Sequence, residues 1–92
     1  MMRYRKRPVE VDAVPAREIM AAAAGGDWGA LPDWIREAYE SGRIVCTVDA
    51  VLIGTLEGEM RGEPADLIVR GIRGELYPCK PDIFADSYER VS

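Results

Sequence analysis

The chain has 92 residues, of which 48% are hydrophobic and 30% charged, and its formal net charge is −4. This length supports one core, so we predict a single domain over residues 1–92 with the composition of an ordinary globular protein. The acidic balance makes nucleic acid an unlikely partner for the surface as a whole, because such affinity comes largely from neutralising phosphates.

The chain contains no histidine. This excludes a Ser-His-Asp or Cys-His catalytic pair, a His-ligated zinc and an imidazole acid or base near neutral pH. Cys46 and Cys79 are too few for a four-thiolate site and are expected to be reduced thiols, with a disulfide as the less favoured alternative. We therefore predict no catalytic residue, no metal and no cofactor, and a protein that is not an enzyme.

No apolar run approaches the roughly 20 residues that span a bilayer. The N-terminus is basic, but no apolar segment of the signal-peptide kind follows it. We expect no membrane partner and a location in the cytoplasm of the cell that makes the protein.

Residues 4–14 alternate as a strand does, with Val9, Val11 and Ala13 on one face and Glu10 and Asp12 on the other. Four basic residues lie within the first seven positions: Arg3, Arg5, Lys6 and Arg7. These charges could form a patch for an anionic partner, but the interpretation that we favour is a charged edge strand protected from pairing with another chain.

Two helices follow in the N-terminal half. The first runs over residues 16–24 after Pro15 and ends at Gly25 and Gly26. The second covers residues 31–40, where apolar residues at helical spacing form a stripe that should pack on a sheet: Leu31, Trp34, Ile35, Ala38 and Tyr39.

From residue 43 the apolar period changes to two. We predict strands over residues 43–48, 51–60, 67–73 and 75–79, with Gly54 as a possible bulge and a turn over residues 61–66. A helical turn over residues 81–84 and a last strand over 88–91 complete the chain. The close spacing permits only antiparallel neighbours. The predicted fold class is therefore α+β: a small antiparallel β-meander, or a partly open barrel, with the two helices packed on it.

Several runs carry a resemblance to a known family: TLEGEM at residues 55–60, GIRGE at 71–75 and YPCKPDIF at 77–84. The opening YRKRPV at residues 4–9 and LPDW at 31–34 fit the same pattern. The chain resembles a family of small tailed-phage and prophage proteins of uncharacterised function. The resemblance implies a phage origin and no reaction. Where the family has Pro-Gly-Asp this chain has Ala65, which favours a type I turn over type II.

Three cations of the predicted meander could converge on one site: Arg70, Arg73 and Lys80. With Tyr77 and Thr55 they would form a cationic, partly aromatic pocket for a phosphate-bearing small molecule or an acidic protein patch. The alternative is a solvated sheet face. Cys79, between Pro78 and Lys80, and the paired acids Glu57 and Glu59 are weaker candidates for chemistry.

The function that these features favour is a non-enzymatic phage accessory protein in the cytoplasm of the infected host. It would bind a host protein or sequester a small anionic ligand. The alternative is a minor virion or assembly protein that works by self-association as a homo-oligomer.

Overall fold

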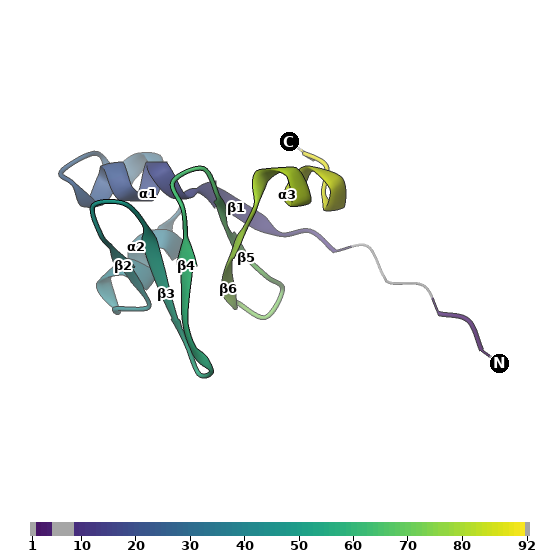
Figure 1. Ribbon diagram of the computed structural model, residues 1–92. Helices are drawn as coiled ribbons and strands as arrows, with labels where there is room; N and C mark the ends of the chain where they lie inside the picture. Colours follow the sequence, from purple (N-terminus) through teal and green to yellow (C-terminus); the bar gives the residue numbers. More distant parts are fainter. Residues whose placement is uncertain (1, 5–8, 92) are drawn as a thin grey trace.

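The computed structural model describes residues 2–4 and 9–91 of the chain. The fold is α+β, as the sequence predicts (Figure 1). In chain order the elements are β1 (Asp12–Pro15), α1 (Ala16–Ala23), a 3₁₀ turn η1 (Trp28–Ala30), α2 (Asp33–Glu40), β2 (Ile44–Cys46), β3 (Val51–Thr55), β4 (Gly58–Gly62), β5 (Leu67–Arg70), β6 (Leu76–Cys79) and α3 (Pro81–Ser87).

The strands form two antiparallel three-stranded sheets with the orders β1-β5-β6 and β2-β3-β4. The predicted meander is thus divided: it runs through β2, β3 and β4 and then crosses to the second sheet, where β6 lies against β4. Within residues 9–91 the two sheets do not close into a barrel. In Figure 1 the helices α1 and α2 lie on one side of β2-β3-β4, and α3 lies beyond β6.

The N-terminal strand is much shorter than predicted. Of the residues that the structure describes in this segment, Asp12–Pro15 alone pair, with Leu67–Arg70 of β5. Residues 9–11 are not in a strand, and residues 5–8 lie outside the described part of the chain. The alternation of residues 4–14 is real, but β5 offers four residues to pair with, so the strand begins at residue 12.

The strand predicted over residues 51–60 is two strands joined by a hairpin. Thr55 lies opposite Gly58 in the register, and its hydroxyl donates to the Gly58 carbonyl at 2.6 Å. Gly58 has φ 134°, which only glycine adopts readily. The proposed bulge at Gly54 is absent, because this residue pairs regularly with Glu59. Gly58 was the sign of this turn in the sequence, because glycine readily adopts the positive φ found there.

Three further boundaries differ from prediction. The strand expected over residues 67–73 ends at Arg70, and the helical turn expected over residues 81–84 extends through Ser87 as α3. Residues 88–91 form no strand. The type I turn predicted at Ala65 agrees with the structure, since no described non-glycine residue has positive φ, as type II would require there.

The core lies between the sheets and the two N-terminal helices. It is built from small and branched aliphatic side chains: Val14, Ala16, Ile19, Ile35, Ala38, Ile44, Val51, Ile53, Ile68 and Leu76. The stripe of α2 packs inward as predicted through Ile35 and Ala38, with Trp34 and Leu31 partly buried beside them. Tyr39 instead stacks on Trp28 with ring centroids 4.7 Å apart.

The two sheets meet at Gly62, a buried residue at the end of β4. A Cβ atom here would lie 2.9 Å from Ile68 Cδ1 and 3.4 Å from Pro78 Cβ. Ile68 and Pro78 belong to β5 and β6, so the absence of a side chain at residue 62 lets one sheet touch the other.

We predict that Gly62→Ala lowers the free energy of unfolding by about 1–3 kcal/mol, the usual cost of overpacking a filled core. Urea unfolding followed by circular dichroism measures this. Gly54→Ala is the matched control, because the atom nearest to its added Cβ lies 3.9 Å away. Equal stability of the two variants would contradict the close contact of the sheets.

Candidate functional site

The structure does not bring the five predicted site residues together. In the register of β5 and β6, Arg70 lies opposite Leu76 and Val69 lies opposite Tyr77. Successive residues of a strand point to opposite faces, so Arg70 and Tyr77 are on opposite sides of the sheet. The single pocket predicted from Arg70, Arg73, Tyr77, Lys80 and Thr55 is therefore wrong in its geometry.

The other three residues are also separated. Thr55 is at the tip of the β3-β4 hairpin, and Arg73 is exposed in the turn between β5 and β6. Lys80 binds the buried carboxylate of Asp66, with Nζ 3.1 Å from Oδ1 and 3.2 Å from Oδ2. Adjacent strands were expected to place these cations side by side, but the pleat and the ion pair of Lys80 direct them to different surfaces.

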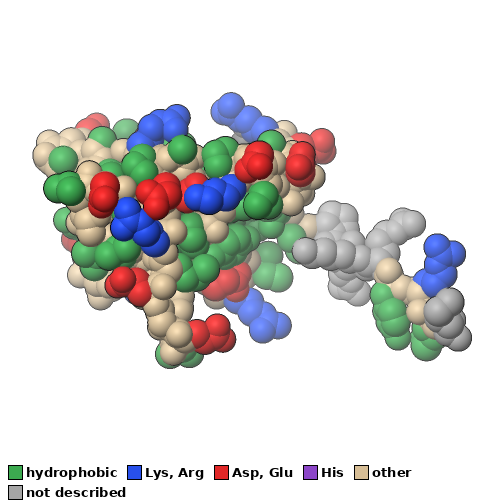
Figure 2. Space-filling model, in the orientation of Figure 1, with side chains coloured by type: hydrophobic (Ala, Val, Ile, Leu, Met, Phe, Trp, Pro, Cys, Tyr) green, Lys and Arg blue, Asp and Glu red, His purple; other side chains and the backbone are tan. Residues whose placement is uncertain are grey.

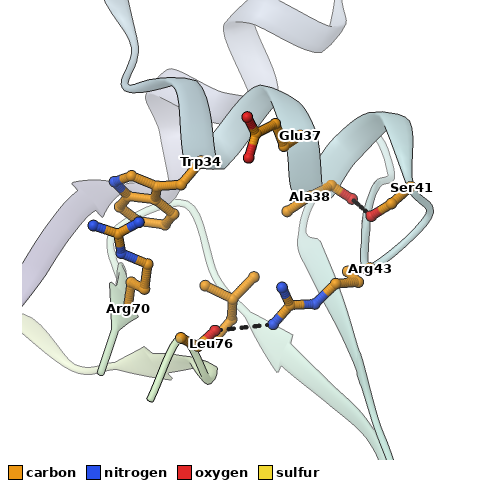
Figure 3. A pocket seen from close by; sticks show the side chains of 8 residues that line it. Trp34, Glu37, Ala38, Ser41, Arg43, Arg70 and Leu76 are labelled. Carbon is orange, nitrogen blue, oxygen red and sulfur yellow. Dashed lines mark hydrogen bonds between the residues drawn. The ribbon is translucent and has the colours of Figure 1, made fainter. Parts of the chain in front are cut away.

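A recess of about 300 Å³ lies between α2 and the end of the β1-β5-β6 sheet (Figure 3). We name it the α2 cleft, and its lining residues are Trp34, Glu37, Ala38, Ser41, Arg43, Arg70, Gly74 and Leu76. Of the five predicted site residues, Arg70 alone lines it. The recess is at the lower end of the size range of small-molecule sites.

Two guanidinium groups face this cleft from different elements. The Arg70 guanidinium lies over the indole of Trp34, with Cζ 5.0 Å from the ring centroid, and pairs with the Asp12 carboxylate at 2.5 Å. Arg43 donates one hydrogen bond of 3.1 Å to the Gly74 carbonyl. These contacts fix the orientation of both guanidinium planes. Each guanidinium carries five N–H donors, which is more than these contacts use.

The rest of the lining is mixed in chemistry. Figure 3 shows the Glu37 carboxylate directed toward the space between the two arginines. The Ser41 hydroxyl donates to the Ala38 carbonyl at 3.1 Å and so closes the end of α2. The cleft therefore offers two cations, one acceptor carboxylate and one aromatic face.

Sequence reasoning missed Arg43 and Glu37 as lining residues. Glu37 lies outside the apolar stripe of α2, and Arg43 directly follows the glycine that ends the helix. Gly42 has φ 85°, and this reversal of the chain returns Arg43 toward the sheet. A glycine after a helical pattern signals the end of the helix, so Gly42 can be identified from the sequence. The position of Arg43 directly after this glycine was the signal that could have indicated its place in the cleft.

A second hollow, which we name the outer groove, lies on the other face of the β1-β5-β6 sheet. It has a volume of about 1510 Å³. Its floor includes Ala13, Leu67, Tyr77 and Cys79, and residues 84–91 line it from the C-terminal side. The Tyr77 and Tyr88 hydroxyls are 3.5 Å apart across it.

The cysteines and the paired acids, the weaker candidates from the sequence, are not arranged for catalysis or metal binding. Cys79 and Cys46 are free thiols. Cys79 lies near the Lys80 carbonyl at 3.6 Å, while the ammonium of that lysine is bound to Asp66. Burial raises the pKa of the Cys46 thiol, which disfavours its thiolate. Glu57 lies in the hairpin turn and Glu59 in β4, so the prediction that they share a strand is wrong.

The outward face of β2-β3-β4 carries both acidic and basic side chains, and these form ion pairs. Arg61 pairs with Asp49 at 3.3 Å and with Glu63 at 2.8 Å. Figure 2 shows acidic and basic side chains interspersed over this view of the molecule. A mixed surface of this kind is typical of a solvated face rather than of a phosphate-binding one.

Comparison with protein-family models, with curated proteins and with solved structures finds no match for this chain. The resemblance to phage proteins thus stays a prediction from the sequence. Over the described residues, none of the helices has the length and apolar character to cross a membrane. The same residues contain no cluster of three or more cysteine or acidic side chains placed to hold a metal ion.

We predict that Asp66→Ala destabilises the fold by about 1–3 kcal/mol, because it removes the acceptor for both the Glu63 amide and Lys80. Lys80→Met should cost less, about 1 kcal/mol or below, since its ammonium is largely exposed and the Glu63 hydrogen bond remains. Chemical unfolding of both variants measures the difference. A larger effect of Lys80→Met than of Asp66→Ala would contradict this ranking.

The outer groove raises the pKa of Tyr77 from 10.0 to about 12, first by burial of the phenol and then by its hydrogen bond with Tyr88. The unfolded chain loses this proton near pH 10 and the folded chain only near pH 12. The contribution of Tyr77 to stability is therefore complete below pH 10 and falls between pH 10 and 12.

Absorbance titration at the wavelength of tyrosinate should accordingly show one late-titrating phenol. Tyr77→Phe should remove that late step, whereas Tyr4→Phe, at an exposed position, should leave it. A step that survives in Tyr77→Phe would show that a different tyrosine titrates late.

Proposed function

We propose that this protein is a non-enzymatic accessory binding protein and that the α2 cleft receives a small anionic ligand. The observation that carries the proposal is the placement of Arg43 and Arg70 on two sides of one recess beside the Trp34 indole. Guanidinium groups bind phosphate and carboxylate oxygens through paired N–H donors, and they do so most strongly when held in a fixed orientation.

The cleft also favours a particular kind of anion. The indole provides a flat apolar face, and Glu37 can accept a hydrogen bond from an amino or imino group. An anion that carries a planar ring with an N–H donor satisfies all three groups, and this is the chemistry of a nucleotide. A hollow of this size suits such a molecule better than it suits the surface of an acidic host protein.

The same lining supports the proposal of binding without turnover. The cleft holds one carboxylate, and its one hydroxyl, that of Ser41, donates within the helix end. The chain also has no histidine to serve as an acid or base near neutral pH.

The setting of this function is part of the proposal. The resemblance of residues 55–60, 71–75 and 77–84 to phage proteins supports a role in the cytoplasm of an infected host. There a small acidic protein could lower the free concentration of an anionic host metabolite by binding it in stoichiometric amounts.

We predict that nucleoside phosphates quench Trp34 fluorescence in a saturable manner, measured in a Trp28→Phe background. Arg43→Gln should weaken binding by about 10–100-fold, as expected when a charge-assisted hydrogen bond is lost. Arg73→Gln is the matched control, since it removes the same charge from the exposed turn outside the cleft. Inorganic phosphate tests whether the anion alone is sufficient.

Two results would overturn the proposal. One is the absence of saturable binding with ligand up to about 1 mM, the range of weak specific complexes. The other is equal weakening by Arg43→Gln and Arg73→Gln, which would indicate attraction by net charge rather than a site.

A further inference from the structure

The outer groove is much larger than the α2 cleft and has an elongated outline. Its volume is about 1510 Å³, above the range of about 300–1,000 Å³ that is usual for small-molecule sites. Its lining follows residues 9–13 and Pro15 on one side and includes residues 87–91 on the other. A strand-like chain laid along residues 9–15 would span at most about 25 Å. The groove therefore fits a segment of polypeptide better than a small molecule.

The floor of the groove is apolar and largely aromatic. The side chains of Leu67, Tyr77, Phe84 and Tyr88 are half-buried there. The rings of Phe84 and Tyr88 have centroids 4.9 Å apart, and the hydroxyls of Tyr88 and Tyr77 are 3.5 Å apart. Since these rings hold one another in place, a partner can bury apolar side chains on them with little cost of ordering the floor.

The lining of the groove is acidic. It carries four acids and one base: Glu10, Asp12, Glu18, Glu89 and Arg90. Asp12 is already paired with Arg70. Glu10 and Glu18 are exposed, and neither takes part in the salt bridges found among residues 2–4 and 9–91. These carboxylates favour a cationic occupant, and the neighbouring aromatic faces also attract cations.

The edge of β1 adds a reason to expect an extended occupant. β1 pairs with β5 on one side, and over the described residues no strand pairs with its other side. The edge of a sheet presents backbone N–H and C=O groups that an extended segment can bind. The groove thus combines backbone hydrogen-bonding groups, an apolar floor and an acidic lining.

We propose that the outer groove binds an extended segment of another protein in which Lys or Arg side chains stand beside apolar ones. The apolar side chains are buried against Leu67 and Tyr77, and the cations reach Glu10 and Glu18. This surface and the α2 cleft lie on opposite faces of the β1-β5-β6 sheet. The protein would accordingly have a docking surface for a basic protein segment in addition to a site for a small anion.

Fluorescence anisotropy with labelled synthetic peptides tests this binding on the full chain. The first peptide alternates Lys and Val over about eight residues, the length of the groove. In the second peptide Ser replaces Val, and in the third Glu replaces Lys. We expect saturable binding of the Lys/Val peptide, binding about tenfold or more weaker for Lys/Ser because the floor is not covered, and none for Glu/Val.

Charge reversal at the lining shows where the peptide binds. Glu10→Lys and Glu18→Lys should each weaken binding of the Lys/Val peptide about tenfold or more. Glu59→Lys is the matched control, because it makes the same change at an exposed acid of β4 outside the groove. Amide chemical shifts recorded during the titration should change at Ala13, Leu67 and Tyr77 and stay constant at Glu59.

Three results would overturn the proposal. The first is no saturable binding of the Lys/Val peptide up to about 1 mM. The second is equal weakening by Glu10→Lys and Glu59→Lys, or equal affinity for the Lys/Val and Lys/Ser peptides, since either would indicate attraction by charge alone. The third is a dimer of the chain in sedimentation velocity that the peptide dissociates, which would identify a second copy as the occupant.

Discussion

The turn that contains the buried Asp66 holds three separated parts of the chain together. Asp66 is only 3% exposed, and its carboxylate accepts the Glu63 amide at 2.8 Å and binds the ammonium of Lys80. The same turn presents its carbonyls to the first helix: the Ala16 amide donates to the Asp66 carbonyl at 2.9 Å and the Arg17 amide to that of Pro64 at 3.2 Å. Pro15 has no side-chain oxygen to cap α1, so these carbonyls satisfy its first amides.

This junction connects α1, the turn between β4 and β5, and the end of β6. It fixes the start of α1 against the crossing from β4 to β5, and it ties the end of β6 to the same point. Because β4 and β6 then lie against each other at Gly62, the side chains of Ile68 and Pro78 pack directly against the backbone of β4. The α2 cleft and the outer groove are consequently on opposite faces of one thin sheet, separated by the thickness of β1, β5 and β6.

Sequence reasoning predicted the fold class, both helices and the presence of most strands, because apolar period and helix-end glycines report local structure directly. The stripe of α2 and the end of α1 near Gly25 are examples. It failed at the β3-β4 hairpin, where one strand was predicted over residues 51–60 and Gly58 was not recognised as a turn residue. It also predicted a longer β1, since an alternating pattern indicates that a segment can form a strand but not that a neighbouring strand is present to pair with it.

Only part of the candidate site could be predicted from the sequence. The physical reason differs from the one that limited the prediction of the fold. Arg70 was identified, but a site depends on the face to which each side chain points, and that requires the register. One residue of shift in the pairing of β5 with β6 would have placed Arg70 and Tyr77 together. Arg43 follows the C-terminal end of α2. Its contact with Gly74 joins residues that are distant in sequence, so no local pattern predicts it.

The ion pair of Asp12 and Arg70 connects the edge strand β1 to the α2 cleft. Because the Asp12 carboxylate already neutralises the guanidinium that lies over Trp34, an anion in the cleft would compete with Asp12 for Arg70. The affinity of the proposed site for an anion therefore depends on the edge strand as well as on the residues that line the recess.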